Sequence, residues 1–265
     1  MQVSANKNVK KRALLLFTNS FGTEYRGKLS LYRQKNGKAL HNLLLKRVLS
    51  VISESAKSSD FDLIVSTDQP AQKELISAQF KNSHSFIIQK QSGGDFGERF
   101  SNSVKSAFDL GYSSLIVLGN DCPDISSAII KNSFEKLGAE NSAVVGPSVD
   151  GGFYLLGINE YNSGLFKNIA WQTNRVLGQL CDNAEILGKS LQFESVLADI
   201  DNNRDLISWF EKKSSYAEKF KKILFELFNT ITFARKIIVP FLGLDYFYKR
   251  VSQKSPPFIS LNTSI

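Results

Sequence analysis

The chain is poor in the residues that build soft-metal and nucleophilic sites. Its 265 residues include only two cysteines and two histidines. Cys122 and Cys181 stand alone, which indicates neither a disulfide framework nor the paired spacing of a zinc site. We expect His41, in a basic amphipathic helix, and His84, in a polar loop, to be solvated rather than catalytic. The sequence also lacks a serine-nucleophile elbow and a phosphate-binding P-loop motif.

Long apolar runs are missing as well. No stretch approaches the roughly 20 apolar residues of a membrane-spanning helix, and the apolar part of the N-terminal region is too short for a signal peptide. These absences predict a cytoplasmic protein. The net charge of +8 is uneven, because residues 211–265 hold ten Lys or Arg against four Asp or Glu. With no zinc-finger or RNA-binding signature in the remainder, we expect no nucleic-acid partner.

Strand-length apolar runs alternate with helical periodicity through the first 210 residues. We expect strands at residues 13–17, 61–65, 85–88, 115–118, 143–147, 152–158 and 191–197. We expect helices at residues 37–56, 71–80, 96–110, 126–137 and 173–182, and a further helix that Asn203 could cap. This alternation predicts an α/β fold, a three-layer αβα sandwich on a mostly parallel sheet.

The pattern changes after residue 210, which predicts a main domain at 1–210 and a basic, aromatic-rich, helical C-terminal extension at 211–265. In the extension an apolar stripe lies opposite Lys219, Lys221 and Lys222. One interpretation is a helix packed on the domain, followed by a loose tail. Another is an interfacial segment that binds anionic lipid heads, peripherally at the inner face of the membrane. A protein partner or homodimer surface is the third.

Acidic turns follow several predicted strands: Asp121, Asp150, and Asp199 with Asp201. Ligands of open α/β sheets bind beyond the carboxyl ends of the strands, so we expect these carboxylates to meet at one rim. An Asp in such a turn can instead cap a helix or close a turn. We expect Asp124 to cap the next helix, which leaves Asp121 for function. Carboxylates suit a divalent cation that also binds substrate phosphates.

A glycine-rich turn opens the helix expected after residue 95. Gly93 and Gly94 allow close approach of a ligand to the backbone, and a helix N-terminus favours anions. The alternative is that Asp95 caps the helix and Glu98 completes a capping-box-like pair. Arg99 can grip a phosphate or an acidic turn through its guanidinium group.

Several motifs together indicate a family. They read QSGGDFGERF from residue 91, GNDCPDI from 119, VVGPSVDGGFYLLGI from 144, and DIDNNRDL from 199, with Leu165-Phe166 before Trp171-Gln172-Thr173. In this order they resemble a bacterial domain-of-unknown-function family of GT-A-like glycosyltransferases. That family is linked by name to arsenosugar biosynthesis and is related to nucleotide-diphospho-sugar transferases. The resemblance covers about residues 13–210.

The resemblance implies a GT-A-like fold, a nucleotide-sugar donor and a divalent metal, Mg²⁺ or Mn²⁺, on Asp121. It places a second metal-facing group at the Asp199/Asp201 turn, for which we take Asp201, and Asp150 on the acceptor side, where we assign it as the candidate base. The other residues expected on the acceptor side are Gly151, Gly152, Tyr154 and Trp171.

On the donor side the chain departs from the family's first loop, whose Lys-Thr-Arg-Leu run is lost. Gly22 remains, and Arg26 and Lys28 supply positive charge. The residues expected to contact the nucleotide and its phosphates are Gly22, Arg26, Lys28, Gly93, Gly94, Asp95 and Arg99.

Three functions are therefore compared. The first is metal-dependent glycosyl transfer from a nucleotide-diphosphate sugar to a small acceptor. The second is nucleotidyl transfer with release of pyrophosphate, because Gly93-Gly94, Arg99 and Ser103-Val104 loosely resemble a cytidylyltransferase stretch. The third is a non-catalytic relative that binds a partner or membrane through residues 211–265.

Overall fold

The computed structural model describes residues 11–20, 34–69, 76, 86–138, 141–201, 205–206 and 208–209. Several expectations from the sequence fall outside these residues and stay predictions. They are Gly22, Arg26, Lys28, His84, the helix at 71–80, the cap at Asn203 and the extension 211–265. Of the described helices, none is long and apolar enough to cross a membrane.

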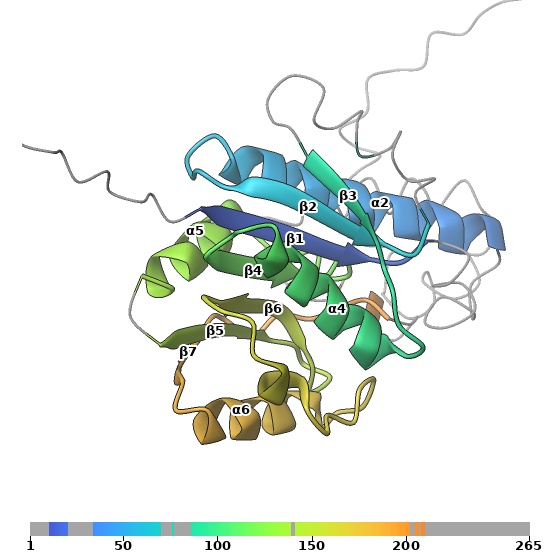
Figure 1. Cartoon of the computed structure of the whole chain (residues 1–265). Helices are drawn as coiled ribbons and strands as arrows, with labels where there is room; N and C mark the ends of the chain where they lie inside the picture. Colours follow the sequence, from blue (N-terminus) through green and yellow to red (C-terminus); the bar gives the residue numbers. More distant parts are fainter. Residues whose placement is uncertain are drawn as a thin grey trace, which may run out of the picture. The chain divides into compact units, whose positions relative to one another are not determined.

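A mixed seven-stranded sheet forms the centre of the fold (Figure 1). Its strands are β1 Arg12–Thr18, β2 Asp62–Thr67, β3 Phe86–Lys90, β4 Ser114–Leu118, β5 Ser142–Pro147, β6 Phe153–Ile158 and β7 Ser190–Phe193. The order is β3-β2-β1-β4-β6-β5-β7. Only β6 runs antiparallel to its neighbours, β4 and β5, and the other pairs are parallel. The mostly parallel sheet predicted from the sequence is confirmed.

Helices cover both faces of the sheet, so the predicted three-layer sandwich is confirmed (Figure 1). On one face lie α2 (Gln34–Ser55) and α5 (Ser127–Lys136), and on the other lie α4 (Phe96–Asp109), the 3₁₀ turn η2 (Ser163–Phe166) and α6 (Val176–Ile186). β1 shows why its sequence is a continuous apolar run. Leu14 and Leu16 enter the first core, whereas Leu15 and Phe17 enter the second, as expected for a strand buried on both faces.

The start of α5 corrects one prediction from the sequence. The N-cap is Ser126, whose hydroxyl accepts a hydrogen bond from the Ile129 amide at 3.4 Å. Asp124, which we expected in that role, instead accepts a hydrogen bond from Trp209 Nε1 at 2.9 Å. The side chains of Asp124 and Ser126 can both accept a hydrogen bond at a helix N-terminus. Because Trp209 binds Asp124, Ser126 is the residue that caps the helix. Asp124 therefore joins the loop after β4 to Trp209, far along the chain.

The expectation that His41 is solvated was wrong. This side chain lies on α2 and is only 2% exposed. It shares the buried face of the helix with Leu44, Leu45 and Val48, three, four and seven residues further on. Burial lowers the pKa of His41 from 6.5 to about 4, although nearby Asp68 favours the charged form.

A buried neutral histidine makes the fold sensitive to acid. Because the unfolded chain takes up a proton on His41 near pH 6.5 and the folded chain only near pH 4, stability falls as the pH drops through this window. The full effect is about 3 kcal/mol. Urea unfolding of the wild type and of His41→Gln at several pH values checks this expectation. The variant should lose less stability than the wild type between pH 6.5 and 4, and equal losses would contradict the assignment.

Candidate active site

Strand register explains why two distant acidic turns meet. β5 and β7 pair in parallel, and the pairing resumes beyond the strands at an isolated bridge between Ser148 and Leu197. Val149 donates a backbone hydrogen bond to Leu197 at 3.0 Å, which continues this contact. Asp150 lies two residues after Ser148, and Asp199 lies two residues after Leu197. The carboxyl ends of β5 and β7 therefore deliver the two carboxylates to the same place.

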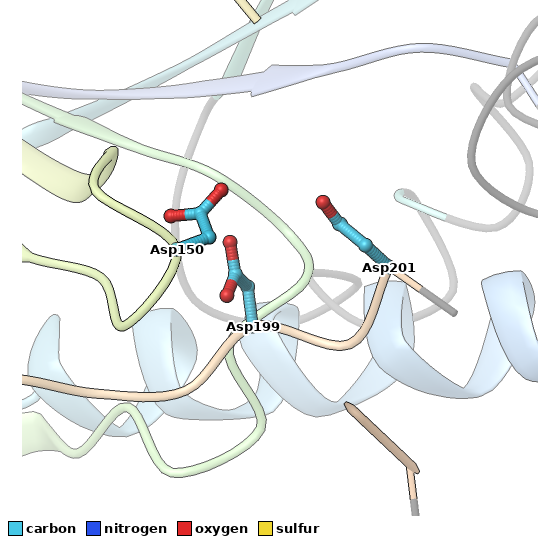
Figure 2. A group of neighbouring side chains, drawn as sticks. All are labelled: Asp150, Asp199 and Asp201. Atoms are coloured by element: carbon cyan, nitrogen blue, oxygen red, sulfur yellow. The ribbon is translucent and has the colours of Figure 1, made fainter. Parts of the chain in front are cut away.

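Three carboxylates converge at this rim of the sheet (Figure 2). One oxygen each from Asp150, Asp199 and Asp201 lies within 4.8 Å of the others, and Asp150 is exposed while the other two are half-buried. Like charges at this separation repel one another, and a bound cation would offset that repulsion. Carboxylate oxygens are the ligands that Mg²⁺ and similar hard cations prefer. The donor set therefore fits the divalent metal that the sequence predicted.

The Asp150 carboxylate is held by its own turn. Its Oδ1 accepts hydrogen bonds from the Ser148 hydroxyl and, at 2.8 Å, from the Gly152 amide. Gly151 has a φ of 90°, and a Cβ there would lie 2.3 Å from the Asn174 carbonyl oxygen. Only glycine fits this position without strain. The sequence offered two alternatives for Asp150, closing an Asp-Gly turn or providing a functional carboxylate. Asp150 does both, because its carboxylate closes the turn and also lies in the cluster.

Asp121 lies beside the cluster through its main chain. Its carbonyl oxygen accepts a hydrogen bond from the Ile200 amide at 3.0 Å, so the loop after β4 borders the segment that holds Asp199 and Asp201. Its carboxylate is not among the three that meet, and Oδ1 lies 3.0 Å from where a Cβ on Gly119 would be. The role of Asp121 as a metal ligand stays a prediction.

Asp199 was expected at this rim as part of the Asp199/Asp201 turn, and its carboxylate lies in the cluster. The Asp199-Ile200-Asp201 spacing explains why both carboxylates reach it. Residues two apart in an extended segment point to the same side. Ile200 between them is 1% exposed, which agrees with this alternation.

The glycine-rich turn before α4 is a helix cap, as the alternative interpretation had it. Asp95 Oδ1 accepts from the Glu98 amide at 2.8 Å, and the Glu98 carboxylate accepts from the Gly94 amide at 2.7 Å. Two acidic side chains thus already occupy amide groups that a phosphate would use. Gly93 is required here, because a Cβ on this residue would lie 2.7 Å from the backbone nitrogen of Arg99. Arg99 itself is half-buried, and its phosphate contact stays a prediction.

Tyr154 and Trp171, both expected on the acceptor side, have packing partners in the structure. Tyr154 is 3% exposed, and its hydroxyl donates to the Ser195 carbonyl at 2.9 Å. Burial raises the pKa of Tyr154, which keeps this hydroxyl protonated. Trp171 is half-buried and packs its ring against Phe96, Phe100 and Phe153. The structure therefore gives Tyr154 a role in the core and leaves Trp171 partly exposed.

Comparison with solved structures defines the fold class. A crystal structure from Desulfovibrio desulfuricans G20, described as a "putative nucleotide-diphospho-sugar transferase", has a TM-score of 0.69. It is 20% identical and matches 83% of this chain and 95% of its own. The chain thus has the GT-A-like fold of nucleotide-diphospho-sugar transferases.

The family resemblance inferred from the motifs is also confirmed. Residues 51–173 match the model of the family described as "Uncharacterized protein conserved in bacteria (DUF2064)". This segment contains the two most specific motifs, GNDCPDI and VVGPSVDGGFYLLGI. No curated protein sequence matches the chain.

Two weaker structural similarities complete the comparison. A cytidylyltransferase from Leptospira borgpetersenii is 15% identical with a TM-score of 0.46, over 94% of this chain and 99% of that one. Rv0371C from Mycobacterium tuberculosis H37Rv, solved as a complex with manganese, is 12% identical with a TM-score of 0.44. That match covers 77% of this chain and 99% of the other. Likenesses this weak add nothing to the functional assignment.

Proposed function

We propose that the protein is a divalent-cation-dependent glycosyltransferase that uses a nucleotide-diphosphate sugar and a small acceptor. The main support is the convergence of Asp150, Asp199 and Asp201 at the carboxyl ends of β5 and β7. This is the rim at which α/β folds bind ligands. The nucleotide-diphospho-sugar transferase fold and the family motifs support the choice of donor.

Each residue of the proposed site has a distinct role. Asp199 and Asp201 hold the cation, with Asp150 or Asp121 completing the set. When bound, the cation stabilises the negative charge that develops on the departing nucleoside diphosphate. Arg99 steadies the diphosphate, together with Arg26 or Lys28 from the first loop.

Asp150 also serves the acceptor in this proposal. Because Ser148 and Gly152 hold Oδ1, the carboxylate has a defined orientation, and Oδ2 is left for the cation or for a proton of the acceptor hydroxyl. A carboxylate at the site thus orients the acceptor and removes its proton as the new bond forms.

A thermal-shift panel tests the proposal. The full-length chain is heated with nucleoside diphosphates, nucleoside triphosphates or nucleotide sugars, each with and without Mn²⁺. A donor at 100 times its Kd stabilises the native state by about 2.7 kcal/mol, which should raise Tm by several degrees. We expect the largest shift for a nucleotide sugar with Mn²⁺.

Other outcomes of the panel separate the alternatives. A response limited to nucleoside triphosphates, accompanied by pyrophosphate release, would replace glycosyl transfer by nucleotidyl transfer. No response to any nucleotide, with or without Mn²⁺, would favour the non-catalytic alternative.

A further inference from the structure

Two of the three clustered carboxylates lie on a segment outside the regular strands. β7 ends at Phe193, and Asp199 and Asp201 follow in residues 194–201, which we call the carboxylate segment. Backbone hydrogen bonds hold its far half, from Leu197 to Pro147 in β5 at 3.1 Å, from Val149 to Leu197 at 3.0 Å and from Ile200 to Asp121 at 3.0 Å. The Asp201 amide also donates to the Asp205 carboxylate at 3.1 Å. The position of the two carboxylates therefore depends on these contacts together with the anchor at the start of the segment.

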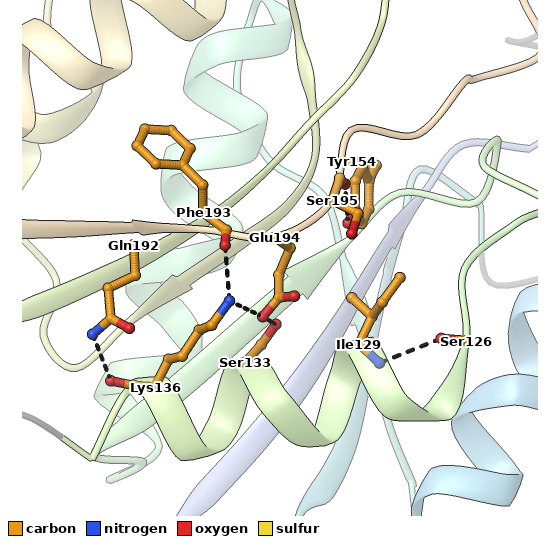
Figure 3. Close-up of polar contacts among 9 residues, drawn as sticks. All are labelled: Ser126, Ile129, Ser133, Lys136, Tyr154, Gln192, Phe193, Glu194 and Ser195. Atoms are coloured by element: carbon orange, nitrogen blue, oxygen red, sulfur yellow. Dashed lines mark hydrogen bonds and ion pairs between the residues drawn. The ribbon is translucent and has the colours of Figure 1, made fainter.

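An ion pair between a buried carboxylate and a partly exposed ammonium group anchors that start (Figure 3). The Glu194 side chain is only 7% exposed, and its Oε1 lies 2.7 Å from Lys136 Nζ on α5. Ser133, one turn earlier on α5, donates to the same oxygen at 3.3 Å. Lys136 Nζ also donates to the Phe193 carbonyl at 2.8 Å, so one ammonium group holds two successive residues.

The next residue is held from the sheet (Figure 3). The buried Tyr154 hydroxyl on β6 donates to the Ser195 carbonyl at 2.9 Å. The Glu194 amide donates to the Val145 carbonyl at 2.9 Å and extends the β5–β7 pairing. Residues 193–195 are thus clamped by a helix on one side and by two strands on the other.

An ion pair with a buried carboxylate adds little to the free energy of unfolding, so stability alone does not explain its presence here. Burying the Glu194 carboxylate costs hydration free energy that its attraction to Lys136 offsets only in part, and apolar residues of similar volume often stabilise a fold equally well. What the pair adds is a shared anchor, since one ammonium group contacts both the Glu194 carboxylate and the Phe193 carbonyl and ties both residues to α5. Cation sites need such anchoring because each ligand oxygen must lie at bonding distance.

We propose that Glu194 and Lys136 are positioning residues for the carboxylate cluster. By fixing the start of the carboxylate segment against α5, they set the spacing of Asp199 and Asp201 relative to Asp150. This inference rests on the cation site of the proposed function. Neither residue touches the cation, so the effect is transmitted through the backbone of residues 194–198.

The test is Mn²⁺ binding by the full-length chain, measured from the electron paramagnetic resonance signal of free Mn²⁺. Lys136→Met keeps the apolar stem and removes the ammonium group. We expect it to weaken Mn²⁺ binding by about 10-fold, the smallest loss typical of residues that orient metal ligands without touching the metal. Lys136→Arg, which restores the charge and the donors, should recover most of the affinity. Lys131→Met is the matched control on α5, because Lys131 forms only an exposed ion pair, 3.9 Å from Glu135. It should bind Mn²⁺ as the wild type does.

Glu194→Gln provides a second variant that keeps the shape and a hydrogen-bond acceptor, and it should weaken Mn²⁺ binding in the same direction. Tm of each variant is measured beside its affinity. If both variants lose stability and yet bind Mn²⁺ as tightly as Lys131→Met, the pair has a structural role only, and this inference is overturned. If the wild type itself binds no Mn²⁺, the cation site of the proposed function fails, and this inference fails with it.

Discussion

Replacing Asp199 by Asn is expected to weaken Mn²⁺ binding by about 100-fold, because the affinity of such sites depends strongly on the number of charged ligands. The same substitution should leave Tm of the cation-free protein unchanged or higher. The reason is that the cluster brings three carboxylate oxygens within 4.8 Å of one another, so removing one charge relieves repulsion. Affinity and stability should thus move in opposite directions, which distinguishes a ligand from a residue that merely holds the fold.

Titration of Mn²⁺ by calorimetry and thermal unfolding without metal measure the two quantities. Asp109→Asn is the matched control, because Asp109 is an exposed carboxylate at the end of α4 that pairs with Lys105. It should bind Mn²⁺ with wild-type affinity. An Asp199→Asn variant with unchanged Mn²⁺ affinity would remove Asp199 from the site.

Gly151→Ala is expected to lower the free energy of unfolding by about 3 kcal/mol, because a side chain at a φ of 90° is strained and the new Cβ would lie 2.3 Å from the Asn174 carbonyl oxygen. Backbone atoms cannot move aside as a flexible side chain can. The turn that orients Asp150 should shift, so Mn²⁺ binding should weaken as well. Urea unfolding and Mn²⁺ titration of the variant check both effects.

Gly178→Ala is the control for this substitution. Gly178 lies in α6, and a Cβ there meets nothing within 4 Å. Alanine is the better helix former, so this variant should be more stable than the wild type by about 0.5–1 kcal/mol. If Gly151→Ala were as well tolerated as Gly178→Ala, the turn would not have the rigidity that the site requires.

The fold could be predicted from the sequence because its signals are local. Apolar runs such as 115–118 mark strands buried on both faces, and they alternate with amphipathic helices such as α4. The family motifs then indicated a GT-A-like fold. The acidic turn at Asp150 was recognised as a candidate site from its position after a predicted strand.

What escaped prediction depends on tertiary contacts. Asp124 and Ser126 are both good helix caps, and only the approach of Trp209 shows that Asp124 is used elsewhere. His41 was expected to be solvated because its helix is rich in lysine. Its spacing from Leu45 nevertheless places it on the buried face of that helix. The exact membership of the cluster is also tertiary: the sequence grouped Asp121 with Asp150 and the Asp199/Asp201 turn, and the pairing of β5 with β7 brings together Asp150, Asp199 and Asp201.

The central claim is that the carboxylates of Asp199 and Asp201, beside that of Asp150, form a divalent-cation site. Anomalous X-ray scattering from crystals grown or soaked with Mn²⁺ tests it most directly, because the manganese signal locates the ion without reference to activity. The account predicts one strong anomalous peak at direct bonding distance from oxygens of Asp199 and Asp201. A peak bound elsewhere, or none at saturating Mn²⁺, would contradict it.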